Sequence, residues 1–142
     1  MSARLQYLLD TNVLSETRRK QADECVISFL SAAEPSALYI SVLTLGELRK
    51  GVAIKKRSDP DAATKIASWV DGLEFSFADR ILGINAATAT LWGELSVQRP
   101  RPVIDTLLAA TAVVHDLTLV TRNTSDVHDI KLKLLDPWKK EK

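Results

Sequence analysis

The chain contains little of several residue types that commonly mark a function. It has one cysteine, Cys25, which excludes an internal disulfide bond, fits a reducing compartment and predicts by default a small buried apolar residue. Its glycines form no glycine-rich loop of the kind that cradles phosphates. Its two histidines, His115 and His128, are too few and too far apart for a histidine-based metal site, and Ser41 has no credible histidine partner for a nucleophilic triad.

Long apolar runs are also missing. No window approaches the roughly 20 apolar residues that a membrane span requires. The N-terminal apolar stretch is short and ends at Asp10, which does not fit a signal peptide. We therefore expect a cytoplasmic protein with no membrane partner.

The excess charge is small, because the formal net charge is +1. Such a chain carries no global signature for binding polyanions. Its basic residues are nevertheless clustered, at positions 18–20, 49–50, 55–57, 99 and 101, and 139–140. A solvated face is the usual meaning of one such cluster, but several flank acidic segments. A basic rim around an acidic centre is the arrangement that a phosphodiester enzyme needs.

The remaining composition is that of an ordinary globular protein. With 142 residues, of which 46% are hydrophobic and 26% charged, the chain predicts one domain over residues 1–142. Apolar segments predict strands at 5–9, 38–41, 80–84, 117–121 and 132–135. Helical spacing and capping signals predict helices at 12–18, 22–33, 42–54, after Pro60, 85–98 and 103–116. This alternation predicts an α/β fold of three layers, α/β/α, with a central and mainly parallel sheet of four to five strands.

Four acids stand where a predicted strand ends or a predicted helix begins: Asp10, Glu47, Asp105 and Asp126. Sites in open parallel sheets lie beyond the carboxyl ends of the strands, so we expect these side chains to gather at one edge. Clustered carboxylates repel one another, and at neutral pH they hold either protons or a cation. Oxygen ligands of this kind favour Mg²⁺ or Mn²⁺.

Each acid also has a simpler interpretation. Asp10 is a candidate N-cap, and Thr44 with Glu47 matches the capping-box pattern. Asp105 suits the positive end of a helix, and Asp126 lies in a stretch that forms Asx turns. These local roles do not predict that all four acids share one sheet edge, which favours the joint interpretation.

Four segments around these acids resemble the motifs of the PIN-domain family, and in particular of the VapC-type toxin ribonucleases of type II toxin–antitoxin systems. The segments are Leu8–Glu16, Ser41–Gly51, Val103–Ala112 and Leu119–Asp126. Their order and spacing cover nearly the whole chain. The segment Trp92–Leu95 is also similar to a subgroup that includes the FitB-like proteins.

The resemblance implies a Mg²⁺- or Mn²⁺-dependent endoribonuclease that leaves a 5′-phosphate and a 3′-hydroxyl. Asp10 and Asp105 would be the principal metal ligands, and Glu47 and Asp126 would complete the cluster or act through water. Whether Asn123 or Asp126 contacts the metal stays open. The implied partners are an RNA substrate, a cognate antitoxin and a second copy of the chain.

Other residues have candidate supporting roles. The Thr11 and Thr121 hydroxyls and the Asn12 amide are candidates for holding the carboxylates in place. Candidate phosphate contacts are Arg18, Arg19, Arg99, Arg101 and Arg122. Two alternative functions remain: a non-catalytic RNA- or protein-binding module, and a Mg²⁺-binding receiver-like signalling domain. The latter needs adjacent acids near the N-terminus and a lysine after a late strand, and neither is present.

Overall fold

A parallel β-sheet forms the centre of the molecule. The computed structural model describes residues 5–139 of the chain. The strands are β1 (Tyr7–Leu9), β2 (Leu38–Ser41), β3 (Ile81–Leu82), β4 (Thr118–Val120) and β5 (Leu134–Leu135). Their order across the sheet is β3-β2-β1-β4-β5, and every neighbouring pair is parallel. The predicted α/β fold is therefore confirmed, with a sheet that is entirely rather than mainly parallel.

Helices connect the strands. They are α1 (Thr11–Glu16), α2 (Glu24–Ala32), α3 (Val42–Ser58), α4 (Pro60–Ser76), α5 (Ala86–Gln98) and α6 (Val103–Val114), with a short 3₁₀ helix at Pro35–Ala37. The largest difference from the predicted boundaries is α3, which continues past Ile54. Its last turn carries Lys55, Lys56 and Arg57, basic side chains that favour the negative end of a helix. Asp59 then ends α3 and caps α4 by accepting the Ala62 N–H, directly before Pro60.

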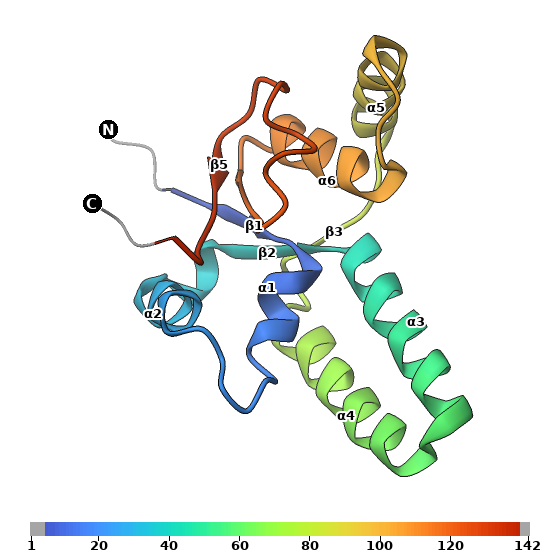
Figure 1. Ribbon diagram of the computed structural model, residues 1–142. Coiled ribbons are helices and arrows are strands. Elements are labelled where there is room, and N and C mark those ends of the chain that lie inside the picture. The colour runs from blue at the N-terminus through green and yellow to red at the C-terminus, as the bar shows by residue number, and fades with distance from the viewer. Residues whose placement is uncertain (1–4, 140–142) are drawn as a thin grey trace.

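Both faces of the sheet are covered by helices, which gives the three layers (Figure 1). Adjacent residues of a strand point to opposite faces, so Leu8 packs in one core and Leu9 in the other. The core around Leu8 includes residues of α5 and α6, and the core around Leu9 includes residues of α1, α2, α3 and α4. In Figure 1, α3 and α4 form a hairpin that extends away from the sheet.

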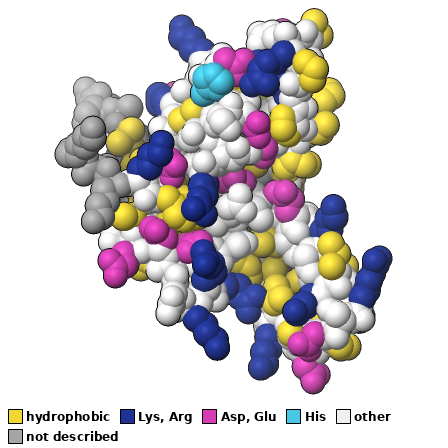
Figure 2. Space-filling model, in the orientation of Figure 1, with side chains coloured by type: hydrophobic (Ala, Val, Ile, Leu, Met, Phe, Trp, Pro, Cys, Tyr) yellow, Lys and Arg dark blue, Asp and Glu magenta, His cyan; other side chains and the backbone are white. Residues whose placement is uncertain are grey.

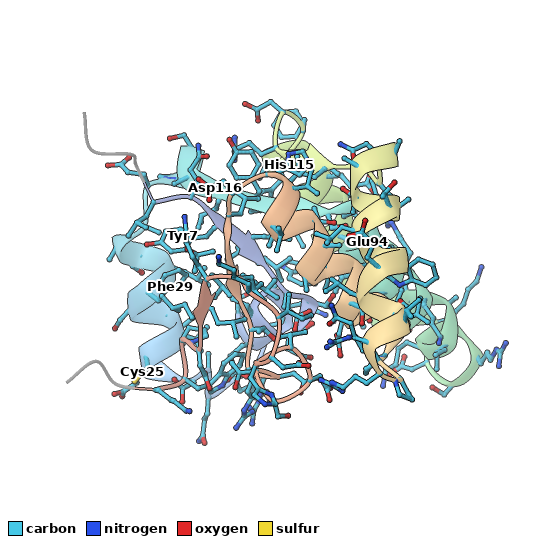
Figure 3. The ribbon with its side chains drawn as sticks, turned by 90° about the horizontal axis from the view of Figure 1, so that it is seen from above. Tyr7, Cys25, Phe29, Glu94, His115 and Asp116 are labelled. Carbon is cyan, nitrogen blue, oxygen red and sulfur yellow. The ribbon has the colours of Figure 1, made fainter. Side chains whose placement is uncertain are left out.

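The predicted roles of cysteine and tryptophan have different outcomes. Cys25 is partly exposed on α2 rather than buried (Figure 3). Trp69, Trp92 and Trp138 are partly buried and pack against the two cores, as predicted. Among residues 5–139, no helix is long and apolar enough to cross a membrane.

Candidate active site

Asp10 lies at the carboxyl end of β1, the central strand. It is buried, with 6% of its surface exposed. One carboxylate oxygen accepts the backbone N–H of Thr11 at 2.7 Å, so Asp10 is the N-cap of α1, as one interpretation of the sequence predicted. The other oxygen accepts the hydroxyl of Thr121, which follows the neighbouring strand β4, at 2.8 Å. Two hydrogen bonds, from residues that follow β1 and β4, therefore fix the orientation of this carboxylate.

Glu47 lies on α3, the helix that follows β2. The capping-box interpretation of Thr44 and Glu47 is wrong, because α3 begins earlier and its cap is Ser41, which accepts the Leu43 N–H at 3.0 Å. Glu47 is exposed and accepts the Thr11 hydroxyl at 2.6 Å. Thr11 thus donates to Asp10 through its backbone and to Glu47 through its side chain, which joins the start of α1 to α3.

Asp105 and Asp126 share one donor, the side-chain amide of Asn123. The Asn123 nitrogen Nδ2 donates to Asp105 Oδ2 at 3.0 Å and to Asp126 Oδ2 at 2.6 Å. The backbone N–H of Asn123 donates to the Thr121 hydroxyl oxygen at 3.0 Å. Since that hydroxyl donates in turn to Asp10, one chain of hydrogen bonds connects the loop after β4 to three of the acids.

Electrostatics show that the four acids share one environment. The pKa of Asp105 is raised above its ordinary value of 3.8, first by partial burial and then by the negative charges of Asp10, Asp126 and Glu47. The group that lowers this pKa is Asn123, which is neutral. The structure therefore brings all four predicted acids together at the carboxyl edge of the strands.

The acids are not arranged as a finished metal site. Within the described part of the chain, no three Asp, Glu, His or Cys side chains stand in position to hold one ion. Their oxygens are instead engaged by neutral donors: the Thr11 and Thr121 hydroxyls and the Asn123 amide. Asp10, Asp105, Thr121 and Asn123 also line a small hollow. This donor set consists of oxygens only and carries excess negative charge, which fits a hard divalent cation such as Mg²⁺ or Mn²⁺.

Two of the three predicted supporting residues make the expected contacts. The hydroxyls of Thr11 and Thr121 hold Glu47 and Asp10, respectively. Asn12 is exposed, and none of the hydrogen bonds described for the acids involves its amide.

The candidate phosphate contacts do not all remain available. Arg101 was predicted as one, and this is wrong, because 1% of its side chain is exposed and its guanidinium binds Asp129. Arg99 is partly exposed and also binds Asp129. Arg122 is exposed, and its guanidinium lies over the Trp138 ring, 5.0 Å from its centroid. Figure 2 shows Lys and Arg side chains spread over one face, with acidic side chains among them.

Asp129 is the residue that sequence reasoning missed. It belongs to no motif and follows the predicted strand by several residues, so no local signal distinguishes it from an ordinary loop acid. It is distinguished only by its hydrogen bonds with Arg99 and Arg101, about thirty residues earlier in the chain.

Comparison with known proteins identifies the class. The sequence profile of the PIN domain matches residues 7–130. Toxin FitB of Neisseria gonorrhoeae is 31% identical over 140 residues, covering 92% of this chain and 97% of that protein. VapC ribonuclease Y4jK of Sinorhizobium fredii is 31% identical over 137 residues, covering 92% and 96%. A chain in the solved structure of FitAB bound to an IR36 DNA fragment superimposes with a TM-score of 0.87 at 28% identity, covering 96% of this chain and 99% of that one.

The chain belongs to the PIN-domain family, within the group formed by the VapC and FitB toxins of toxin–antitoxin systems. PIN-domain ribonucleases are typically metal-dependent, which agrees with the oxygen-only donor set. The receiver-like alternative is wrong, since the family and the fold are those of PIN domains.

Proposed function

We propose that the chain is a Mg²⁺- or Mn²⁺-dependent endoribonuclease that hydrolyses RNA phosphodiester bonds as the toxin of a type II toxin–antitoxin pair. The observation that carries this proposal is the gathering of four carboxylates at one sheet edge, held there by the Thr11 and Thr121 hydroxyls and the Asn123 amide. The raised pKa of Asp105, caused by burial and then by the other three acids, agrees with it. Repulsion among four carboxylates at one sheet edge destabilises the folded protein unless a bound cation offsets their negative charge. The similarity to VapC ribonuclease Y4jK supports RNA as the substrate.

Asp10 and Asp105 would be the principal metal ligands, with Glu47 and Asp126 completing the set directly or through water. Bound there, the metal would lower the pKa of a coordinated water and offset charge on the phosphoryl oxygens. The chain's own contribution is orientation. Thr121 and the Thr11 backbone hold Asp10 in one rotamer, and Asn123 holds Asp105 and Asp126 at a fixed separation.

Arg122 would hold the RNA backbone. It directly follows Thr121 and precedes Asn123, so its guanidinium starts from the same loop as the acids. The attraction between the Arg122 guanidinium and the Trp138 ring restricts the motion of this side chain and offsets the entropy lost. A phosphate held by Arg122 would lie near the acidic edge, where cleavage is proposed to occur.

The proposed partners follow the relatives. FitB is named a toxin, and FitAB is found bound to DNA, which supports a cognate antitoxin for this chain. A homodimer is supported by exposed apolar side chains on α5 and α6, among them Val97, Val103 and Val113. Figure 2 shows hydrophobic side chains gathered over the region of α5. We also propose that residues 1–142 form a single domain that acts in the cytoplasm, where its RNA substrate would be found.

The test is cleavage of RNA by purified protein as Mg²⁺ or Mn²⁺ is added. Asp10→Asn and Asp105→Asn should each reduce the rate by at least about 100-fold, because losing a ligand costs more than losing an outer contact. The matched control is Asp61→Asn, since Asp61 also lies in the first turn of a helix but is exposed on α4. Full activity of Asp10→Asn or Asp105→Asn, or cleavage that persists in excess chelator, would contradict the proposal. Binding of RNA without cleavage at any metal concentration would favour a non-catalytic module.

A further inference from the structure

Asp129 is bound by two arginines at the same time. Arg99 donates from Nε to Oδ2 at 3.0 Å and from Nη2 to Oδ1 at 2.9 Å. Arg101 donates from Nη1 to Oδ1 at 3.0 Å and from Nη2 to Oδ2 at 3.0 Å. Both contacts are bidentate, the strongest and most directional form of this ion pair. We call this cluster of Arg99, Arg101 and Asp129 the arginine clamp.

The two arginines belong to the linker between α5 and α6. Pro100 and Pro102 alternate with them, and their rings restrict the backbone at both positions. Pro102 directly precedes α6, whose first turn carries Asp105. The linker therefore has a fixed relationship to one acid of the proposed site.

Arg101 forms the buried half of the clamp. Its side chain is 1% exposed. Besides Asp129, it donates to the Leu95 carbonyl at 2.9 Å and to Gln98 Oε1 at 3.0 Å, both on α5. Asp129 is thus bound to a guanidinium that is itself locked to the end of α5, which makes the clamp rigid on the helix side.

Arg99 extends the clamp to the acidic loop. Its Nη2 donates to the backbone carbonyl of Asp126 at 2.9 Å as well as to Asp129. The Asp126 carboxylate accepts the Asn123 amide, which also donates to Asp105. The contacts form a closed loop that runs from the linker through Asp129 and Asp126 to Asn123, and returns through Asp105 to the start of α6.

We propose that Asp129, bound by Arg99 and Arg101, is a positioning residue that holds Asn123 and Asp126 at the correct distance from Asp105. The inference rests on the proposed function, in which Asp105 and Asp126 belong to the set of acids that would hold the metal. Asp129 itself does not touch the proposed site. It acts through Arg99, whose guanidinium donates to the backbone carbonyl of Asp126; without Asp129, that guanidinium loses the carboxylate that orients it against the loop after β4.

The charge on Asp129 supports this role. Hydrogen bonds from Arg99 and then from Arg101 hold the pKa of Asp129 far below its usual range, so the carboxylate is ionised at neutral pH. At neutral pH both arginines therefore face a charged partner, which favours the closed clamp.

The test compares Asp129→Asn with a matched control, Asp116→Asn. Asp116 also forms an ion pair, with Lys133 at 2.9 Å, but it lies in the turn between α6 and β4, before the strand rather than after it (Figure 3). Because Asp129→Asn leaves the buried Arg101 with weaker partners, Arg99→Lys serves as a second variant. Lysine keeps the positive charge but lacks the fork that reaches both Asp129 and Asp126.

The first readout needs neither metal nor RNA. The side-chain amide signals of Asn123 are followed by ¹H–¹⁵N NMR in metal-free protein, and Asn123→Ala assigns them. Asp129→Asn and Arg99→Lys should move these signals towards the values of a free carboxamide, and Asp116→Asn should leave them in place. Asn123 signals that stay in place in folded Asp129→Asn and Arg99→Lys overturn the inference.

The second readout is binding of Mn²⁺ alone, measured by the electron paramagnetic resonance of free Mn²⁺, together with kcat and KM on one RNA. A displaced Asp126 should weaken Mn²⁺ binding and lower kcat by roughly tenfold with little change in KM, the scale of losing an outer contact of a metal site. A lower melting temperature with unchanged Mn²⁺ binding would show a purely structural role and overturn the inference. If wild-type protein neither binds Mn²⁺ nor cleaves RNA, the proposed function fails, and the Asn123 signals alone decide whether the clamp orders the loop.

Discussion

The Thr121 hydroxyl donates a 2.8 Å hydrogen bond to the carboxylate of Asp10, although 111 residues separate the two in sequence. Both residues are buried at the carboxyl ends of neighbouring strands. Thr121→Val keeps the side-chain shape and removes the donor, so it should destabilise the protein by about 1–3 kcal/mol. It should also reduce cleavage, because Asp10 loses one of the two bonds that orient it. Chemical denaturation and the RNA assay measure the two effects.

The control for this change is Thr44→Val. Thr44 is fully buried, and its hydroxyl has no hydrogen-bond partner in the described part of the chain. The same substitution should therefore be neutral or stabilising, since it removes a buried polar group that makes no bond. Equal losses of stability in the two variants would show that packing rather than the Asp10 bond explains the Thr121 result.

Asn123→Asp tests the shared amide. The substitution replaces a donor to two carboxylates by a third carboxylate, so the metal-free protein should lose about 1–3 kcal/mol of stability. Added Mg²⁺ should recover part of this loss, because an extra acidic ligand strengthens binding of a hard cation. Denaturation with and without Mg²⁺ measures both.

The matched change is Asn85→Asp. Asn85 caps α5, and its side-chain oxygen accepts the backbone N–H and the hydroxyl of Thr88. Aspartate retains this acceptor and suits a helix N-terminus, so stability should change by less than about 1 kcal/mol and should not respond to Mg²⁺. If Asn123→Asp also changes stability only slightly and does not respond to Mg²⁺, the Asn123 amide does not relieve repulsion between the Asp105 and Asp126 carboxylates.

Asp105→Asn should raise the stability of the metal-free protein at neutral pH. The folded-state pKa of Asp105 lies above its unfolded value of 3.8. Its contribution to stability is therefore fully present below pH 3.8 and is lost as the pH rises through the raised folded-state pKa. The wild-type protein should become less stable relative to Asp105→Asn across that window, and the two curves should converge at acid pH.

Thermal unfolding of both proteins in chelator, from acid to neutral pH, measures this difference. Adding Mg²⁺ should then reverse the order at neutral pH, because the wild-type protein gains the binding energy of the ion and Asp105→Asn loses a ligand. A wild-type protein that is more stable than Asp105→Asn in chelator at neutral pH would show that the acids do not repel one another as the structure indicates.

Val97→Glu tests the proposed homodimer. Val97 lies on α5 and is 87% exposed, so the change should leave the folded monomer intact. A charge placed in an apolar interface is costly, and the particle mass measured by light scattering should fall to that of the monomer. Phe75→Glu is the control, since Phe75 is also 87% exposed but lies on α4. A mass that is unaffected by Val97→Glu would place any dimer contact elsewhere.

Local pattern was sufficient to predict most of the fold. The strands are apolar segments that end in polar residues, and the helices begin at recognisable caps such as Asp59 and Asn85. Boundaries were less predictable. Most strands are shorter than their apolar segments: β1 begins at Tyr7 rather than Leu5, and β4 covers only Thr118–Val120. Helix α3 is longer because nothing interrupts it before Asp59.

For the site, the sequence supplied the acids but not their contacts. The direction of parallel strands predicts that Asp10, Glu47 and the acid after β4 share one edge, since a parallel sheet aligns all its carboxyl ends. It does not predict that Ser41 caps α3 and thereby leaves Glu47 to bind Thr11. Two cap candidates so close together compete, and packing of Thr44 into the interior decides between them.

What the sequence determined by itself is therefore the order of the elements and the types of residue at their ends, because turn, cap and strand preferences are local. Only the tertiary structure decided that one amide, Asn123, serves two carboxylates, and that Arg101 is buried against Asp129 rather than exposed to RNA. These contacts join residues 3–28 positions apart in sequence. Their energies depend on distance and burial, which exist only once the chain has folded.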